Sequence, residues 1–243
     1  LCHASSVVAL LEGIGSGAVS NPFTDVTDAE VIFLIGANPV SNHPVAATFI
    51  KNAAKNGTKL ILADPRRSEL ARHASHYLQF RPDTDVAMLN AMMHTIVEEG
   101  LVDQDYVSRY TTGFEELKAN LKEYAPEKVS PICGIPAETL KEVARLFAGS
   151  KASMILWGMG ISQHVHGTDN ARCLISLALI SGQIGRPGTG LHPLRGQNNV
   201  QGAADMGCQP HQGAGYFPVA DKKIQDFYTE KYGAVHPTKA GLK

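Results

Sequence analysis

A short apolar run, EVIFLIG at residues 30–36, decides how the rest of the chain folds. It is bounded by turn residues and ends in glycine, which is typical of a strand that is buried on both faces of a parallel sheet. A second apolar run, KLILA at residues 59–63, follows a stretch that is typical of a helix, residues 44–56. Two buried strands joined by a helix predict a parallel pair.

The same alternation of strand and helix extends along most of the chain. Further strands are expected at 75–80 and 152–157, and further helices at 83–99, 113–124, 136–147 and 168–180. The predicted fold class is therefore α/β, a doubly wound, mostly parallel sheet with helices on both faces.

The character of the sequence changes near residue 182, where glycine and proline become frequent and periodicity is lost. A loop of that length usually serves a site or packs on further structure. We expect residues 1–199 to form the α/β domain and residues 200–243 to begin a second, truncated domain. The first residue is not methionine, which favours an internal fragment of a longer protein.

Composition excludes several classes of protein. Hydrophobic residues make up 44% of the chain and charged residues 19%, with a net charge of −1, so no basic surface for nucleic acid is expected. No apolar run reaches the roughly 18 residues of a membrane span. The four cysteines form no C-x-x-C pair, which argues against a disulfide framework or a zinc knuckle and is compatible with a reducing compartment.

Distinctive residues follow each predicted strand. They form the stretches GANPVSNHP at 36–44, ADPRRSE at 63–69, FRPDTD at 80–85 and WGMGISQ at 157–163. Each alone is good turn chemistry, but ligands of parallel sheets bind beyond the carboxyl ends of the strands. Four such ends in one sheet favour a ligand that resembles a nucleotide. The G-x-G-x-x-G fingerprint is absent after the first strand, so the ligand is not expected to be NAD.

The loop HPLRGQNNVQG at residues 192–202 places one arginine among amide side chains. Amides present donors and acceptors together, which suits the edge of a heteroaromatic ligand, although a solvated polar loop is the alternative. The pair Cys2-His3 is a weak signal by itself, because free cysteines are most often buried small hydrophobic residues.

Taken together, these stretches resemble the molybdopterin oxidoreductase superfamily, and within it the catalytic (alpha) subunits of formate dehydrogenases. The resemblance covers LCHASSV at the start, GANPVSNHP, ADPRRSELA, WGMGISQ and GRPGTGLHPLRGQNNVQGAADMG at 185–207, in the family's order. It implies an internal fragment of an enzyme that oxidises formate to CO2.

The resemblance also implies a cofactor and three candidate catalytic residues. The cofactor is bis-molybdopterin guanine dinucleotide carrying molybdenum or tungsten, and the matching metal ligand is Cys2, a soft thiolate. Arg195 would anchor the formate carboxylate. His3 would assist proton or hydride transfer and place a positive or hydrogen-bonding group beside the metal.

Residues that match the cofactor-binding loops follow the strand ends and the late arginine. They are Gly36, Asn38, His43, Asp64, Pro65, Arg66, Pro82, Asp85, Gly158, Met159, Gln163, Gly196, Gln197 and Asn198.

The resemblance implies a larger assembly as well. The parent subunit would hold a 4Fe-4S cluster whose ligands lie outside this fragment, and iron–sulfur and electron-acceptor subunits, NAD-linked or hydrogenase-linked, would be its partners. A cytoplasmic location is expected, with no nucleic acid partner and no membrane span in this fragment. The fragment alone is not expected to be active.

Other interpretations stay open. The chain could serve another reaction of the same superfamily, or be a redox-inert subunit on the same scaffold. It could be a nucleotide-binding module without catalysis, in which Cys2 is only a buried residue. A thiol enzyme that uses Cys2 and His3 as nucleophile and base ranks last, because adjacent side chains more often point apart.

Overall fold

The computed structural model describes residues 2–241. The described residues divide into two compact units, one formed by residues 3–194 and the other by residue 2 together with residues 195–241. The expected domain boundary after residue 199 stays a prediction.

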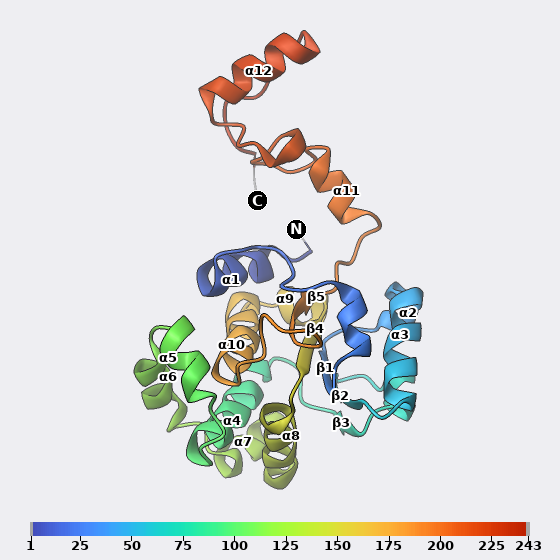
Figure 1. The fold of residues 1–243 in the computed structure, drawn as a ribbon, viewed down its shortest axis with the longest axis vertical. Coiled ribbons are helices and arrows are strands. Elements are labelled where there is room, and N and C mark those ends of the chain that lie inside the picture. Colours follow the sequence, from blue (N-terminus) through green and yellow to red (C-terminus); the bar gives the residue numbers. More distant parts are fainter. Residues whose placement is uncertain (1, 242–243) are drawn as a thin grey trace. The chain divides into compact units, whose positions relative to one another are not determined.

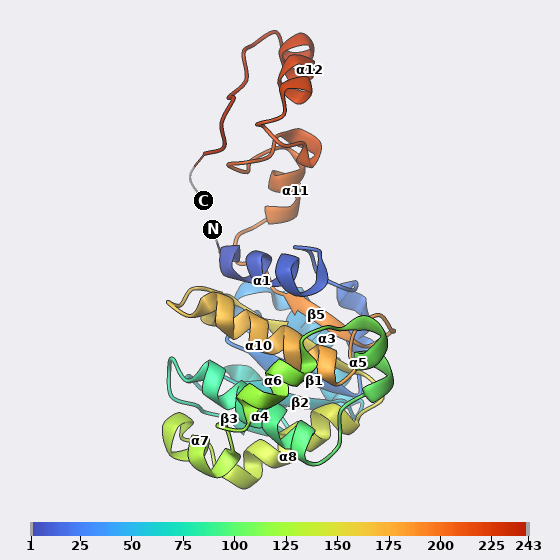
Figure 2. The same ribbon diagram turned by 90° about the vertical axis from the view of Figure 1, so that its left-hand side faces the viewer.

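The larger unit is built on one five-stranded sheet (Figures 1 and 2), in which every pair of neighbouring strands is parallel. The strand order is β3-β2-β1-β4-β5, so the chain winds outward from β1 in one direction and returns to build the other half. The predicted α/β fold is confirmed. The strands are β1 (Val31–Ile35), β2 (Lys59–Ala63), β3 (His76–Leu78), β4 (Ser153–Trp157) and β5 (Gly190–Pro193).

Helices connect and cover these strands. Within the larger unit they are α1 (Ala4–Ile14), η1 (Phe23–Thr27), α2 (Pro39–Asn42), α3 (Pro44–Lys55), η2 (Glu69–Arg72), α4 (Asp85–Glu98), α5 (Gln104–Tyr110), α6 (Phe114–Leu121), α7 (Pro126–Cys133), α8 (Ala137–Gly149), α9 (Met159–Ser162) and α10 (Gly167–Ile180).

The two faces of the sheet bury alternate residues of the same strands. Phe33, Ile155 and Trp157 pack in a large core with α1, α4, α7, α8 and α10, which Figure 2 shows on one side of the sheet. Ile32 and Leu156 pack in a smaller core with η1, α3 and η2. Because both faces are covered, the strands are apolar at nearly every position, which is why short apolar runs predicted them.

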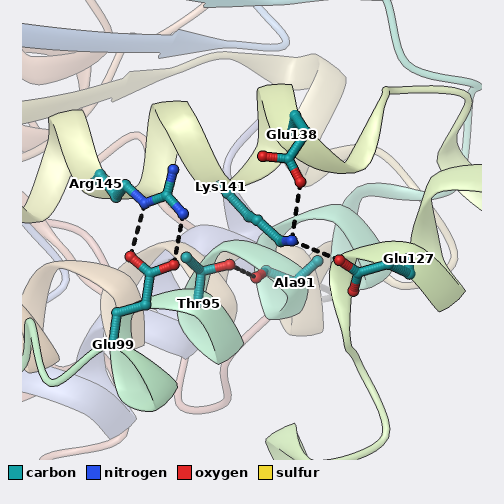
Figure 3. Close-up of polar contacts among 7 residues, drawn as sticks. All are labelled: Ala91, Thr95, Glu99, Glu127, Glu138, Lys141 and Arg145. Atoms are coloured by element: carbon teal, nitrogen blue, oxygen red, sulfur yellow. Dashed lines mark hydrogen bonds and ion pairs between the residues drawn. The ribbon is translucent and has the colours of Figure 1, made fainter.

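The outer helices of the thicker layer are joined by ion pairs (Figure 3). Arg145 of α8 donates from Nε and Nη2 to the two oxygens of Glu99, each at 2.7 Å, just beyond the end of α4. These bonds lower the pKa of Glu99. Lys141 lies between Glu138 of its own helix and Glu127 of α7. These pairs are at least partly exposed to solvent, so each adds little to the stability of the fold.

Several elements differ from the sequence-based prediction. The stretch after residue 182 was expected to lack regular structure, yet β5 lies within it. Gly190 at its start has φ 132° and Pro193 ends it, so the strand lacks the apolar pattern of the others. Helices α1, α5 and α7 were also not predicted; α5 and α7 are short.

The smaller unit contains α11 (Val200–Asp205), η3 (Ala214–Tyr216) and α12 (Lys222–Tyr232). Within residues 195–241, only Ala204 and Tyr228 are buried. Over the described part of the chain, residues 2–241, no helix combines the length and the apolar character needed to cross a membrane.

Candidate functional site

A cavity of about 410 Å³ opens where the strands of the larger unit end. Residues that follow β1, β2, β3, β4 and β5 all contribute to its wall. The lining residues are Gly36, Ala37, Asn38, Asn42, His43, Asp64, Pro65, Arg66, Phe80, Pro82, Asp83, Asp85, Gly158, Met159, Gly160, His164 and Leu194. The cavity lies at the point where the strand order reverses between β1 and β4, the usual ligand position in doubly wound sheets.

Glycines bring the loops after β1 and β4 into direct contact beside this cavity. The Gly160 N–H donates to the Gly36 carbonyl at 3.0 Å, and the Gly158 N–H donates to the Ile35 carbonyl at 3.3 Å. A Cβ on Gly160 would lie 2.7 Å from the Gly36 Cα, and Gly36 itself has φ 58°. These glycines are therefore required first by the packing of one loop on the other.

Asn38 carries a polar atom that the fold leaves unsatisfied. Its Nδ2 donates to the Ser41 Oγ at 3.1 Å, whereas its Oδ1 is buried without a hydrogen-bond partner among the described residues. A buried acceptor without a donor is costly, unless a ligand provides one. An N–H or O–H group of a bound molecule would satisfy it.

Two carboxyl groups of the cavity are desolvated. Burial raises the pKa of Asp85 to about 6, although its own backbone N–H and the nearby His164 act in the opposite direction. Burial also raises the pKa of Asp64, whose Oδ1 accepts from the Arg66 N–H at 2.8 Å. Desolvated carboxyl groups bind strongly to N–H donors, so the wall suits a ligand with amide or amino groups.

The structure brings most of the predicted cofactor residues together. Ten of them line the cavity, namely Gly36, Asn38, His43, Asp64, Pro65, Arg66, Pro82, Asp85, Gly158 and Met159. Gln163 does not line the cavity; it is exposed and directly follows α9. Gly196, Gln197 and Asn198 belong to the smaller unit. Their roles as ligand contacts stay predictions.

Seven lining residues were not among the predicted ones. They are Ala37, Asn42, Phe80, Asp83, Gly160, His164 and Leu194. Most lie inside the stretches that follow the strands, and Asp83, with φ 66°, carries a conformation that only the structure reveals. Its Oδ1 lies 3.8 Å from the His164 Nδ1.

The three candidate catalytic residues are divided between the units. Cys2, 6% exposed, and the partly exposed Arg195 belong to the smaller unit. His3 belongs to the larger unit and is 1% exposed, with both ring nitrogens hydrogen bonded within it. The arrangement of the Cys2 thiol and the Arg195 guanidinium stays a prediction. Among the described residues, no three His, Cys, Asp or Glu side chains are grouped to hold a metal ion.

A parallel sheet with a cavity at its switch point is typical of α/β domains that bind nucleotide-like ligands. Comparison with known protein families makes this specific: the model of the molybdopterin oxidoreductase family matches residues 1–234. The chain belongs to the molybdopterin oxidoreductase family.

Similar proteins include two formate dehydrogenases. The chain is 45% identical, over 90% of its length, to the F420-dependent formate dehydrogenase 1 subunit alpha of Methanococcus maripaludis. It is 40% identical, over 95% of its length, to formate dehydrogenase H of Escherichia coli. The chain spans 32% of each of these relatives.

A solved structure, acetylene hydratase from Pelobacter acetylenicus, is similar with a TM-score of 0.68 and 29% identity. The match covers 76% of this chain and 26% of that one. The same scaffold therefore occurs in an enzyme named for a different reaction, so membership of the family does not by itself assign the reaction.

The cavity fits a molybdopterin group, which the family binds. The unsatisfied Asn38 Oδ1 and the desolvated Asp64 and Asp85 are able to accept hydrogen bonds from N–H groups, which a pterin carries. Arg66 at the same wall is a suitable partner for phosphate. The donor and acceptor set is thus compatible with the family's cofactor.

The raised pKa of Asp85 predicts that Asp85→Asn stabilises the fold in a pH-dependent way. The folded state holds the proton more tightly than the unfolded state, so ionisation destabilises the fold as pH rises from about 4 to about 6. Asp85→Asn should raise the free energy of unfolding by about 1–3 kcal/mol above pH 6, with no gain near pH 4. Urea unfolding between pH 4 and pH 8 measures this. Exposed Asp28→Asn is the control, and a gain independent of pH would contradict the assignment.

The contact between the loops after β1 and β4 predicts that Gly160→Ala is destabilising. The added Cβ meets backbone of Gly36, which cannot move without displacing β1, so we expect a loss of about 1–3 kcal/mol. Gly149→Ala is the matched control, because a Cβ there meets no atom within 4 Å at the end of α8. Equal stability of the two variants in urea would show that the loops separate freely.

Proposed function

We propose that the chain is part of a formate dehydrogenase alpha subunit, an enzyme that oxidises formate to CO2 and passes two electrons through a molybdenum or tungsten centre to iron–sulfur clusters. The observation that carries this proposal is the similarity to two named formate dehydrogenases across at least 90% of the chain. The Cys2-His3 start and the late Arg195 support it, because a thiolate ligand and a carboxylate anchor suit this chemistry.

The cavity of the larger unit is proposed to hold one pterin guanine dinucleotide of a bis-molybdopterin guanine dinucleotide. Asp64, Asp85 and Asn38 would accept hydrogen bonds from its heterocyclic N–H groups, and Arg66 would pair with its phosphates. Gly196, Gln197 and Asn198 would add contacts from the loop after Arg195. Satisfying the buried Asn38 Oδ1 would recover part of the free energy that its isolation costs.

Each candidate catalytic residue has a distinct proposed task. Cys2 is the protein ligand of the metal, and the bound centre supplies an acceptor for two electrons of formate. Arg195 holds the formate carboxylate through two parallel N–H donors, which fixes the orientation of the C–H bond. For His3, the observed hydrogen bonds favour a hydrogen-bonding role over proton transfer.

The remaining features of the parent enzyme are proposed from the same resemblance. They are a 4Fe-4S cluster, iron–sulfur and electron-acceptor subunits of NAD-linked or hydrogenase-linked type, and a cytoplasmic location.

Replacing Arg195 by lysine in the full-length subunit tests the carboxylate anchor. An ammonium group cannot make the two-pronged contact, so kcat/KM for formate should fall about 10- to 100-fold at unchanged metal content. Arg172→Lys is the control, since this exposed arginine pairs with Glu12 and Asp169 on the surface. Full formate turnover by Arg195→Lys would contradict the role of Arg195 as the carboxylate anchor. A parent protein that does not oxidise formate would contradict the proposed function itself.

Replacing Cys2 by serine tests the metal ligand. Because an alcohol is a harder and less acidic ligand than a thiol, formate oxidation should be strongly reduced while the circular dichroism of the α/β domain stays unchanged. Exposed Cys208→Ser is the matched control and should keep full activity. Metal content by mass spectrometry and turnover are measured together. A Cys2→Ser variant with normal turnover would exclude the ligand role.

A further inference from the structure

A chain of hydrogen bonds runs through the interior of the larger unit from Trp157 to Leu194. Its members are Trp157, Ser6, Ser162, His3 and the carbonyl of Leu194. All five residues are at most 5% exposed. They come from β4, α1, α9, the turn before α1 and the residue that follows β5, so these hydrogen bonds join segments that are far apart in the sequence.

One end of the chain fixes the proton on the His3 ring. The His3 Nε2 lies 2.8 Å from the Leu194 carbonyl oxygen. A carbonyl oxygen only accepts, so the Nε2 atom must carry a hydrogen and donate it.

The other end fixes the direction of the remaining bonds. The indole Nε1 of Trp157 only donates, and it donates to the Ser6 Oγ at 2.8 Å. The Ser6 and Ser162 hydroxyls are 2.5 Å apart, and the His3 Nδ1 lies 2.9 Å from Ser162 and 3.2 Å from Ser6.

Two hydroxyl hydrogens serve this cluster, and one of them occupies the contact between the serines. The other is then directed at the His3 Nδ1, whichever serine donates it. A hydrogen on Nδ1 would instead leave one hydroxyl hydrogen without an acceptor in the cluster, at the cost of a buried unmade bond. The arrangement therefore makes Nδ1 the acceptor and Nε2 the donor.

This series of hydrogen bonds is unsuited to carry a proton. It begins at an indole N–H and ends at a backbone carbonyl, and neither group exchanges a proton in the pH range of proteins. Its order does suit a structural task. His3 follows Cys2 directly in the sequence, and Leu194 directly precedes Arg195, so one hydrogen bond joins segments 191 positions apart that lead to the two groups proposed to act on formate.

We propose that His3 is a positioning residue, held by Ser6 and Ser162 with its proton on Nε2 so that it binds the Leu194 carbonyl and sets the segment leading into Arg195. The hydrogen-bond assignment stands on the contacts of the larger unit alone, and its effect on catalysis rests on the proposed function. His3 contributes through the position of its Nε2–H donor and not through the basicity of its ring.

Two substitutions in the full-length holoenzyme separate these properties. The amide nitrogen of glutamine reaches the position of Nε2, whereas that of asparagine reaches only the position of Nδ1. His3→Gln should keep kcat for formate within about threefold of the parent, and His3→Asn should lower it about tenfold or more, because the Leu194 carbonyl loses its donor. Equal losses in both variants would indicate a proton carrier, and no loss in either would show the contact to be dispensable; both results overturn the proposal.

Hydrogen–deuterium exchange of the metal-free protein gives a readout that needs no activity. Peptides covering residues 191–196 should exchange faster in His3→Asn and at the parental rate in His3→Gln. If the parent protein does not oxidise formate, the proposed function fails while this measurement still decides the hydrogen bond. Unchanged exchange in His3→Asn would overturn the assignment.

His94 offers a control with the opposite geometry. Its Nδ1 faces the Leu121 carbonyl at 2.9 Å, so there asparagine should preserve the bond and glutamine should not. Both His94 variants should keep formate turnover, while exchange near residue 121 rises in His94→Gln.

Ser162 provides a second test should His3→Asn fail to fold. Ser162→Thr keeps a hydroxyl donor to Nδ1 and should behave as the parent, whereas Ser162→Ala should lower kcat about threefold or more and speed exchange over residues 191–196. Parental kcat and exchange in Ser162→Ala would overturn the role given to this serine.

Discussion

The backbone contact between Gly160 and Gly36 is the constraint on which the site depends. It joins the loops that leave β1 and β4, the two central strands at which the winding of the sheet reverses. With these loops in contact, the chain opens a cavity beside them instead of filling it with side chains. A Cβ at either position would lie within 2.9 Å of backbone in the other loop, so one of the two loops would have to shift. The fold therefore positions the site through its backbone.

Around this contact, the carboxyl edge of the sheet holds polar groups in two kinds of environment. The cavity wall is left incomplete, with an unsatisfied amide oxygen on Asn38 and a desolvated carboxyl group on Asp85. The chain through His3, in contrast, is internally satisfied by Ser6, Ser162 and the Leu194 carbonyl. An incomplete wall is suited to receive a ligand, and a satisfied interior is suited to hold its surroundings rigid.

Local patterns predicted the central sheet because a strand buried on both faces is apolar almost throughout. β1, β2 and β4 could be read from runs of five residues, and the parallel arrangement then brought their following residues to one edge. β5 was not predicted, because Gly190 and Pro193 leave it without such an apolar run. The pKa of Asp85 depends on its burial, which no local pattern encodes. The hydrogen-bond partners of His3 lie 159 and 191 positions away in the sequence, so no local pattern encodes them either. The pairing of Cys2 with Arg195 rests on the family resemblance alone.

Trp157 is the only tryptophan of this chain, it is fully buried, and its indole N–H is bonded to Ser6. Because this single indole is shielded from water, the tryptophan fluorescence comes from one buried site. Its emission wavelength and quenching by acrylamide therefore report on the interior beneath the start of α1, without any attached label. This chain carries its own optical probe, placed by the same hydrogen bond that orders its interior.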